Sequence, residues 1–392
     1  MILQVFNRYR EFGGEEFIVN WISKRCAGTI PMEELTWNTS DWDSPEGPGL
    51  FGQAIRVIYN WESADTFRRI LRELQPSVIL MHNIYPVGSP SLYRVAEQEK
   101  IPVIQYLHNY RPFSVGGSLW ANGKVVDDAL HGKLLKEVLS GAWQNSRLKS
   151  AIFALALRNL HRSGWLDSIK CWIAISDFVR DRFIEAGVPP ERIITLRHAW
   201  DTIEQVPEQE EENYYLFLSR LVEEKGVRIL LDAWKILAEE LGGSCPKLKI
   251  GGVGPDRKLL LSFSKEHRFV EYLGFVEPAR KSELIGSSRG LVAPSIWWEP
   301  SGLVTFEAYN LARPILASAT GGLQENIIEG KTGFLFAPGS ARNLADAVIK
   351  CEKIGKEGRS KMGQAGRGWL EEFARPEDWY RDFQRILDQV EG

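Results

Sequence analysis

The stretch that decides the fold is LVAPSIWWEPSGLVTFEAYNLARPILASATGGLQENIIEGKTG, residues 291–333. Its first three residues, 291–293, form an apolar run that a proline stops. After Gly302, apolar residues recur at near-helical spacing as far as Leu311. The pattern therefore predicts a strand, a loop and a helix, followed by a second strand and a glycine turn that begins at Gly321.

The start of this predicted helix carries the chemistry. Its first N–H groups have no carbonyl partner inside the helix, and they would face the same side as Glu299. Glu307 lies about one turn further along. A ligand with phosphate at one end and hydroxyls at the other suits such a place. The backbone groups concerned are those of Ser301, Gly302, Leu303 and Val304.

Two glutamates eight residues apart are weak evidence, but the surrounding residues add to it. The stretch resembles the signature of the retaining GT-B glycosyltransferases of glycosyltransferase family four (group 1 type): EPSGL at 299–303, EA at 307–308 and GG at 321–322. The resemblance covers the C-terminal half, with scattered support in the N-terminal half. It implies that Glu299 lies by a donor sugar and that Glu307 binds the ribose hydroxyls of a nucleotide sugar.

Length and composition are those of a two-domain globular protein without a nucleic-acid partner. The chain has 392 residues, 44% hydrophobic and 25% charged, with a net charge of -3. Nucleic-acid binding normally needs a basic face. The four cysteines are far apart, which predicts neither a zinc site nor a disulfide framework. No leader or long apolar run is seen, so we expect a cytoplasmic protein that does not span a membrane.

The N-terminal half alternates strands and helices, which predicts a doubly wound parallel sheet. An apolar strand at 2–6 is followed by Gly13 and Gly14 before a helix. A tight turn is the plainer interpretation of this glycine pair. The resemblance implies instead that both glycines lie against the donor phosphates and the acceptor. The full GxGxxG spacing is absent, which argues against a dinucleotide oxidoreductase.

Two histidines end neighbouring predicted strands, His82 after 77–81 and His108 after 102–107. Both are expected at the ligand edge of the sheet. We interpret His82 as a structural group. The segment YLHNYRP around His108 resembles a family segment whose histidine points toward the donor sugar, so His108 is a candidate catalytic residue, with Asn109 and Arg111 as secondary candidates.

One stretch of the N-terminal half contains a possible motif of a different glycosyltransferase fold. Residues 29–50 read as irregular surface and contain Asp41-Trp42-Asp43, a possible metal-binding DxD of the other main glycosyltransferase fold. No apolar strand precedes it, so we predict a turn and no metal.

Relatives often carry cysteines after the histidine that corresponds to His108 and again after a Gly-Lys-Val turn, where this chain has 113–115 and 125–129. The cysteine-tethered loop is therefore missing, and the acceptor pocket it shapes cannot be carried over.

The segment 147–165, RLKSAIFALALRNLHRSGW, is an apolar helix with basic ends. A core helix with charged ends is one interpretation. A basic amphipathic helix lying on an anionic membrane, where a lipid-linked acceptor would be found, is the other.

The second domain begins with a strand at 214–218 that leads to Arg220 and Lys225. Cations at the ligand edge can hold a diphosphate, arginine by its planar fork and lysine as a point charge. The family has an arginine and a lysine in this turn, both on the diphosphate of the donor. The resemblance further implies that Phe275 and Val276, at the end of the strand 270–276, contact the nucleotide base through their backbone.

We therefore expect an α/β protein of the GT-B class, with two Rossmann-like doubly wound domains facing a cleft. The predicted N-terminal acceptor-side domain is 1–203, joined by a C-terminal helix at 376–392. An acidic linker at 206–213 leads to the predicted nucleotide-sugar-binding domain, 212–375.

The expected activity is transfer of a hexose from a nucleotide sugar, most simply UDP-glucose, to a glycan or lipid-linked acceptor in cell-surface or extracellular polysaccharide synthesis. The resemblance implies retention of anomeric configuration, with no metal or other cofactor. The proposed catalytic residues are Glu299, His108, Lys225 and Arg220. Three alternatives stay open: a GT-B nucleotide-sugar epimerase, a glycan phosphorylase, and a non-catalytic subunit that binds the sugar nucleotide.

Overall fold

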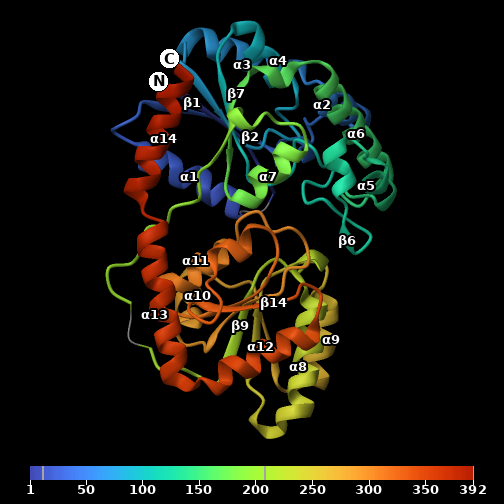
Figure 1. Ribbon diagram of the computed structural model, residues 1–392. Coiled ribbons are helices and arrows are strands. Elements are labelled where there is room, and N and C mark those ends of the chain that lie inside the picture. Colours follow the sequence, from blue (N-terminus) through green and yellow to red (C-terminus); the bar gives the residue numbers. More distant parts are fainter. Residues whose placement is uncertain (11–12, 207–208, 392) are drawn as a thin grey trace. The chain divides into compact units, whose positions relative to one another are not determined.

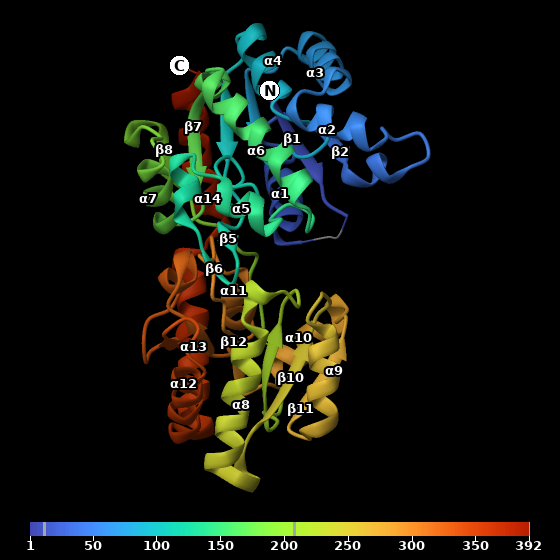
Figure 2. The same ribbon diagram turned by 90° about the vertical axis from the view of Figure 1, so that its right-hand side faces the viewer.

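The computed structural model describes residues 1–10, 13–206 and 209–391. They divide into two units (Figures 1 and 2). Unit 1 comprises Met1–His198 and Pro376–Gly392, and unit 2 comprises Ala199–Arg375. Within the described ranges, no helix combines the length and the apolar character needed to cross a bilayer.

Unit 1 is built on a six-stranded parallel sheet with the order β2-β1-β3-β4-β7-β8. Its central strands β3 and β4 are buried throughout because helices cover both faces of such a sheet. The strands are β1 Ile2–Arg8, β2 Met32–Asn38, β3 Val78–Met81, β4 Val103–Tyr106, β7 Ile169–Ala174 and β8 Ile193–Thr195, and a hairpin adds β5 Trp120–Ala121 and β6 Lys124–Val125. The helices are α1 Gly14–Cys26, α2 Leu50–Ile58, α3 Trp61–Leu74, α4 Ser91–Glu99, α5 Leu135–Ser140, α6 Arg147–Arg162, α7 Asp177–Glu185 and α14 Pro376–Glu391.

The last helix, α14, completes unit 1 rather than unit 2. It lies beside α1, and both chain termini lie at the same end of the unit (Figure 1). Trp21 of α1 and Trp379 of α14 pack edge to face with ring centroids 5.0 Å apart. Arg25 also pairs with Glu377 at 2.8 Å. The chain end is therefore part of the core of unit 1.

Unit 2 repeats the architecture with a second six-stranded parallel sheet, ordered β11-β10-β9-β12-β13-β14. The two doubly wound parallel α/β domains expected from the sequence are confirmed. The strands are β9 Tyr214–Leu218, β10 Lys247–Gly251, β11 Val270–Gly274, β12 Gly290–Ala293, β13 Ile315–Ser318 and β14 Gly333–Phe336. The helices are α8 Val227–Leu241, α9 Arg257–Glu266, α10 Pro278–Gly286, α11 Leu303–Asn310, α12 Ala341–Lys353 and α13 Gly355–Phe373.

Two expectations about the chain were wrong. Residues 32–38, expected to be irregular, form the edge strand β2. An edge strand needs only one backbone partner and is partly open to solvent, so polar residues are tolerated there. Residues 199–203, expected in the first domain, belong to unit 2, where the Trp200 ring packs on Phe306 and the Trp200 N–H donates to Ala374. Part of the expected linker, Pro207 and Glu208, lies outside the described residues.

Candidate functional site

The site of unit 2 lies where the strand order of the sheet reverses. The chain leaves the central strand β9 in one direction and reaches β12 on the other side of it. Ligands in such sheets bind outside the carboxyl ends of the strands at this switch point. Lys225 follows β9, in the short 3-10 turn Glu223–Lys225, and Glu299 follows β12. The topology thus brings two of the predicted site residues together.

Lys225 and Glu299 form a close ion pair. The Lys225 Nζ lies 2.9 Å from Oε1 and 2.7 Å from Oε2 of Glu299. Oε2 also accepts hydrogen bonds from Ser295 Oγ, at 3.0 Å, and from Trp297 Nε1, at 2.9 Å. The Trp297 ring lies under the ammonium, 5.2 Å from Nζ to the ring centroid. The pair is therefore fixed on several sides.

The surroundings keep the Glu299 carboxylate charged. Burial by itself raises the pKa of Glu299, but the Lys225 charge and the hydrogen bonds from Lys225, Ser295 and Trp297 outweigh it and lower the pKa below its usual range. The two side chains are 16% and 12% exposed. A ligand can thus still reach an ionised pair whose geometry is already set.

Two glycines allow the backbone to close around this pair. Gly226 has a φ of +75°, and a Cβ there would lie 1.9 Å from the Pro294 carbonyl oxygen. Gly321 has a φ of +56°, and a Cβ there would lie 2.2 Å from the Glu299 carbonyl oxygen. Any side chain would strain the backbone and force these loops apart. The Lys-Gly and Gly-Gly motifs therefore position the loops that carry Lys225 and Glu299.

The predicted helix start is present as α11. Gly302 precedes it with a φ of +81°, and Ser301 is buried, its carbonyl accepting a hydrogen bond of 2.7 Å from the Asn326 side chain. Leu303 and Val304 are half-buried and supply the first amides of the helix, which lack partners within it. These amides are available to an anion.

Glu307 has an unexpected partner. Its carboxylate forms an ion pair with Lys281 of α10, and both side chains are partly exposed. The sequence analysis did not single out Lys281, which belongs to an ordinary charged helix without a motif. The residue predicted to bind the ribose hydroxyls, Glu307, is thus paired with a lysine of the chain itself.

The remaining candidates of unit 2 are open to solvent. Arg220 is exposed beyond the end of β9 and pairs with no carboxylate among the described residues. Phe275, just after β11, is 66% exposed, and Val276 is half-buried. Both positions are at the carboxyl edge of the sheet.

Unit 1 has its own cavity at the corresponding switch point, between β1 and β3. The cavity has a volume of about 20 Å³, which is room for about one water molecule. Gly13 precedes α1 and Gly14 is its first residue, and a Cβ on Gly13 would meet no atom within 4 Å. Packing among the described residues therefore does not account for glycine at position 13. Polar residues from three strand ends line the cavity: Glu15, His82, Asn83, His108, Asn109 and Arg111.

His108 is held by a chain of hydrogen bonds that starts at Gln4. The Gln4 amide nitrogen donates to Ser23 Oγ at 2.7 Å, so its oxygen faces His82 Nε2 at 3.3 Å and accepts from it. With its proton on Nε2, His82 accepts at Nδ1 from His108 Nε2, 2.8 Å away. Burial, with His82 and His198 nearby, lowers the pKa of His108 well below its usual range. The ring is thus neutral, with its Nδ1 lone pair available to a hydroxyl donor. His82, interpreted as structural, orients it.

Glu15 is a residue that sequence reasoning missed. Its carboxylate accepts hydrogen bonds from the Tyr9 hydroxyl at 3.0 Å, the Asn83 N–H at 3.3 Å and the Asn109 side chain at 3.3 Å. Burial raises the pKa of Glu15 to about 7, despite these bonds and the nearby Arg111 charge. Only its position after the glycine pair was a signal in the sequence.

The two secondary candidates are engaged within the protein. The Asn109 oxygen accepts from the Arg111 backbone N–H at 2.8 Å. The Arg111 guanidinium donates to the Val115 carbonyl and lies 4.5 Å from the centroid of the Trp143 ring. Arg111 Nε, however, has no partner among the described residues, as is true of the Tyr85 hydroxyl beside it in the cavity lining.

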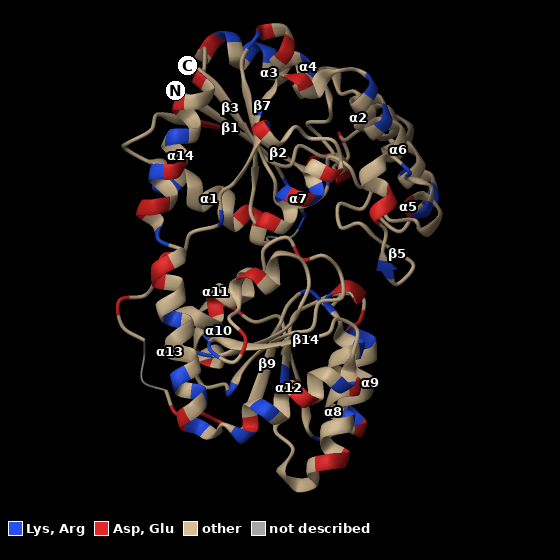
Figure 3. Cartoon of the chain, viewed as in Figure 1, with Lys and Arg blue, Asp and Glu red and all other residues tan. Residues whose placement is uncertain are grey.

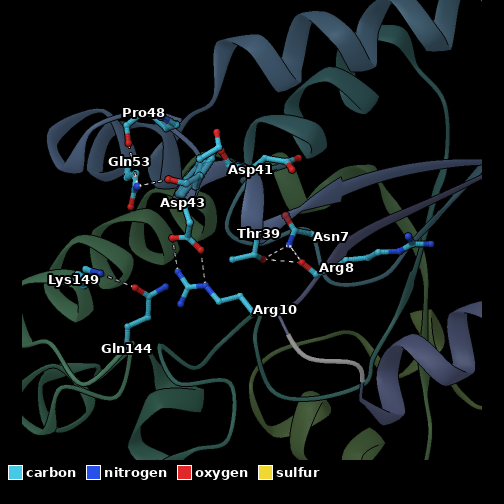
Figure 4. Close-up of polar contacts among 12 residues, drawn as sticks. Asn7, Arg8, Arg10, Thr39, Asp41, Asp43, Pro48, Gln53, Gln144 and Lys149 are labelled. Atoms are coloured by element: carbon cyan, nitrogen blue, oxygen red, sulfur yellow. Dashed lines mark hydrogen bonds and ion pairs between the residues drawn. The ribbon is translucent and has the colours of Figure 1, made fainter. Parts of the chain in front are cut away.

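Residues 41–43 form the end of a 3-10 turn, Thr39–Asp43, rather than an open metal site. Figure 4 shows Arg10 against Asp43, with both Nε and Nη2 of the guanidinium 2.8 Å from a carboxylate oxygen. Asp41 accepts a hydrogen bond of 3.4 Å from Asn38. In the part of the chain that is described, no group of three or more His, Cys, Asp and Glu side chains is arranged for a metal ion. The predicted turn is confirmed.

The loop after His108 has a polar anchor where relatives were expected to have cysteines. The buried carboxylate of Glu137 in α5 accepts from the Ser114 hydroxyl at 2.5 Å and from the Val115 N–H at 2.9 Å. The Gly116 N–H adds a longer bond at 3.4 Å. All four cysteines are free. One carboxylate therefore ties this loop to the helix.

Two family models match adjacent parts of the chain. The model described as glycosyl transferases group 1 matches residues 199–369, and the glycosyl transferase 4-like domain matches 34–198. The chain belongs to the group 1 glycosyltransferases. This family of transferases is the one that the sequence motifs resemble.

Curated relatives share only part of this glycosyltransferase. Glycogen synthase of Mycobacterium tuberculosis is 35% identical over 136 residues, which cover 34% of this chain and 32% of that protein. Phosphatidyl-myo-inositol mannosyltransferase of Mycobacterium leprae is 31% identical over 135 residues, 34% of this chain and 36% of that protein. The chain thus spans about a third of the length of each.

A solved structure matches this glycosyltransferase over its whole length. HepE of Anabaena, solved with UDP-glucose, aligns with a TM-score of 0.64 and 18% identity over 99% of this chain and 100% of that one. At this identity the likeness shows the fold alone.

Proposed function

We propose that this glycosyltransferase moves a hexose from a nucleotide sugar to a glycan or lipid-linked acceptor with retention of anomeric configuration. The donor of first choice is UDP-glucose, and no metal takes part. The observation that carries the proposal is the preformed Lys225–Glu299 pair at the switch point of unit 2, beside the first amides of α11.

The Lys225–Glu299 pair can form further hydrogen bonds to a nucleotide-sugar donor. An ammonium has three N–H groups, and two of those on Lys225 bond to Glu299, which leaves one for a phosphate oxygen. Glu299 Oε1 accepts only from Lys225 within the described residues, so it can also accept from a sugar hydroxyl. One pair can thus contact both sides of the bond that breaks.

Charge on the leaving diphosphate is neutralised by groups of the chain itself. Lys225, the exposed Arg220 and the amides of Leu303 and Val304 supply positive charge and hydrogen-bond donors. Glu307 binds the ribose hydroxyls, oriented by Lys281. Because these donors are fixed in place, they need no reorganisation as the bond breaks, and the attacking hydroxyl can lose its proton to the departing phosphate.

In unit 1, the cavity residues suit an acceptor or sugar hydroxyl. His108 offers a lone pair at Nδ1, and Glu15 is a carboxylate that changes charge near neutral pH. Gly13, two residues before Glu15, leaves open space where a Cβ would stand. We assign hydroxyl recognition, rather than nucleophilic attack, to His108.

Similarities support the choice of substrates. HepE, solved with UDP-glucose, supports a UDP-hexose donor, and the mannosyltransferase named for phosphatidyl-myo-inositol supports a lipid acceptor. A cytoplasmic enzyme at the inner face of the membrane, building a cell-surface or extracellular polysaccharide, fits these substrates.

The donor is tested by thermal shift of the full chain with UDP-, GDP- and ADP-sugars, with and without magnesium. A true donor at a hundred times its dissociation constant stabilises the fold by about 2.7 kcal/mol. We expect UDP-glucose to do so equally with and without magnesium. A magnesium requirement would refute metal-independent binding.

Transfer itself is tested with Lys225→Ala and Glu299→Gln. Each removes one fixed electrostatic contact, so we expect kcat to fall on the order of 10²- to 10³-fold. Lys235→Ala, which removes an exposed lysine paired with Asp232 on α8, is the matched control. Unchanged transfer in both site variants would sink the assignment, and donor conversion without any acceptor would indicate an epimerase instead.

A further inference from the structure

Three helices of unit 1 expose large apolar side chains to solvent. Helix α6 packs against both α2 and α5, and the three lie together in Figures 1 and 2. Phe51 is 80% exposed and Leu148 is 72% exposed. Such residues normally lie in a core, so their exposure on neighbouring helices needs an explanation. The other exposed apolar residues of these helices are Leu50, Ile55, Leu135, Leu139 and Leu155.

The same helices carry cations and almost no anions. Among the residues of α2, α5 and α6, all of which are described, Glu137 is the only acid, and it is buried against the loop that it anchors. Two of the cations are neutralised by neighbours, Arg56 by Glu62 and Lys136 by Asp128. Figure 3 shows the basic residues of these helices in blue and acidic residues in red.

The cations of α6 form no ion pair with a carboxylate among the described residues, although Lys149 is near enough to Asp43 to contribute to lowering its pKa. The Arg147 guanidinium donates to the Leu139 carbonyl and the Lys149 ammonium to the Gln144 side chain. Arg158 and Arg162 are exposed near the end of the helix. The helix therefore presents unbalanced positive charge.

Leucines and arginines share one side of α6. Leu148, Leu155 and Arg162 follow at seven-residue intervals, about two turns each, and Arg158 is one turn beyond Leu155. The opposite side, with Phe153, is buried in unit 1. The helix thus has both a core face and an apolar, basic outer face, so the two interpretations of 147–165 are compatible.

We propose that the outer faces of α2, α5 and α6 form a docking surface for an anionic lipid bilayer. Exposed leucine and phenylalanine side chains enter the boundary between headgroups and acyl chains, and the cations of α6 lie against the lipid phosphates. Charge complementarity favours this occupant, because the surface has unpaired cations and no exposed acid. Docking would bring the chain to a lipid-linked acceptor, and this consequence rests on the proposed function. Binding to the bilayer itself does not depend on the proposed function.

The test is sedimentation of the full chain with vesicles. We expect binding to vesicles of phosphatidylglycerol and phosphatidylcholine, and little binding to phosphatidylcholine alone. Salt should release the protein, because charges near the surface are screened within about 8 Å at physiological ionic strength. Each basic side chain contributes about fivefold to partitioning, so Arg158→Gln/Arg162→Gln should weaken it roughly 25-fold.

A matched pair of variants separates this surface from net charge. Lys24→Gln/Arg385→Gln removes two exposed cations from α1 and α14, on another side of unit 1 (Figure 1), and should bind vesicles as the unchanged chain does. Phe51→Ser/Leu148→Ser tests the apolar part. It changes only exposed side chains, and we expect at least a tenfold loss of binding with unchanged thermal stability.

Three results would overturn the proposal. The first is no binding to anionic vesicles, and the second is an equal loss in the α1 and α14 variant. The third is a dimer of the free protein that Phe51→Ser/Leu148→Ser dissociates, which would assign the surface to a second copy of the chain. Transfer to a soluble acceptor should be unchanged in all these variants, so failure of docking is distinguishable from failure of the proposed activity.

Discussion

Acidification should destabilise unit 1 through its buried histidines. Burial lowers the pKa of both His82 and His198 to about 3, and lowers that of His108 well below its usual range. Unfolded histidine titrates near pH 6.5. The unfolded chain therefore takes up protons first as the pH falls, and stability is lost between about pH 6.5 and 3.

Glu15 acts in the opposite direction. Its pKa is raised to about 7, so the folded state takes up this proton first, which contributes stability that is lost as the pH rises from about 4.5 to 7. Between pH 6 and 5, these three histidines oppose Glu15, a difference of about two protons. Two further groups of unit 1 act in opposite directions, His161 with a lowered pKa and Glu137 with a raised pKa. At about 1.36 kcal/mol per proton and pH unit, folding should lose up to roughly 2.7 kcal/mol per pH unit.

Hydrogen exchange of the full chain, measured by mass spectrometry on peptides from β1, β3 and β4, reports the stability of unit 1 at pH 7, 6 and 5 after correction for intrinsic exchange. We expect His198→Gln to lower the slope by about 1.4 kcal/mol per pH unit. His131→Gln is the control, because the His131 side chain is 48% exposed. Constant stability from pH 7 to 5, or a rise on acidification, would refute the reasoning.

Two further predictions concern unit 2. Gly226→Ala should lower the melting temperature and reduce transfer, because the added Cβ would lie 1.9 Å from the Pro294 carbonyl oxygen. The control is Gly28→Ala, which has a similar φ of +79° but no atom within 4 Å of the added Cβ, and it should cost only about 1 kcal/mol of stability. Equal melting temperatures for the two variants would contradict the steric argument. Lys281→Met releases Glu307 from its ion pair and should raise the Kd for UDP roughly tenfold, because one charge-assisted contact worth about 1.5 kcal/mol is lost. The Kd is measured by isothermal titration calorimetry. An unchanged Kd would mean that Glu307 plays no part in binding.

Much of the fold follows from local patterns in the sequence. The apolar runs that became β9 and β12 predict strands because both faces of a parallel sheet are covered. The polar strand β2 could not be predicted in this way. An edge strand is held by backbone hydrogen bonds, which do not require apolar side chains. Likewise, the exposed leucines of α6 could not be told from core leucines before their neighbours were known.

The candidate site was predictable only where a motif names a residue. Lys225 and Glu299 were chosen by resemblance, but their pairing across 74 positions of sequence depends on the neighbouring strands β9 and β12. Lys281 has no motif, and the raised pKa of Glu15 arises from burial that only the assembled cavity creates. Such environments are properties of the fold rather than of local sequence.

The Glu137 tether has a consequence for how the segment beyond His108 matures. Hydrogen bonds to a carboxylate close as soon as α5 docks, so this segment needs neither an oxidant to be completed nor a reductant to be released. Its conformation should be the same in a thiol-rich and an oxidising compartment. Acid does not release it either, because burial raises the pKa of Glu137 and the folded segment therefore binds this proton more tightly than the unfolded chain does.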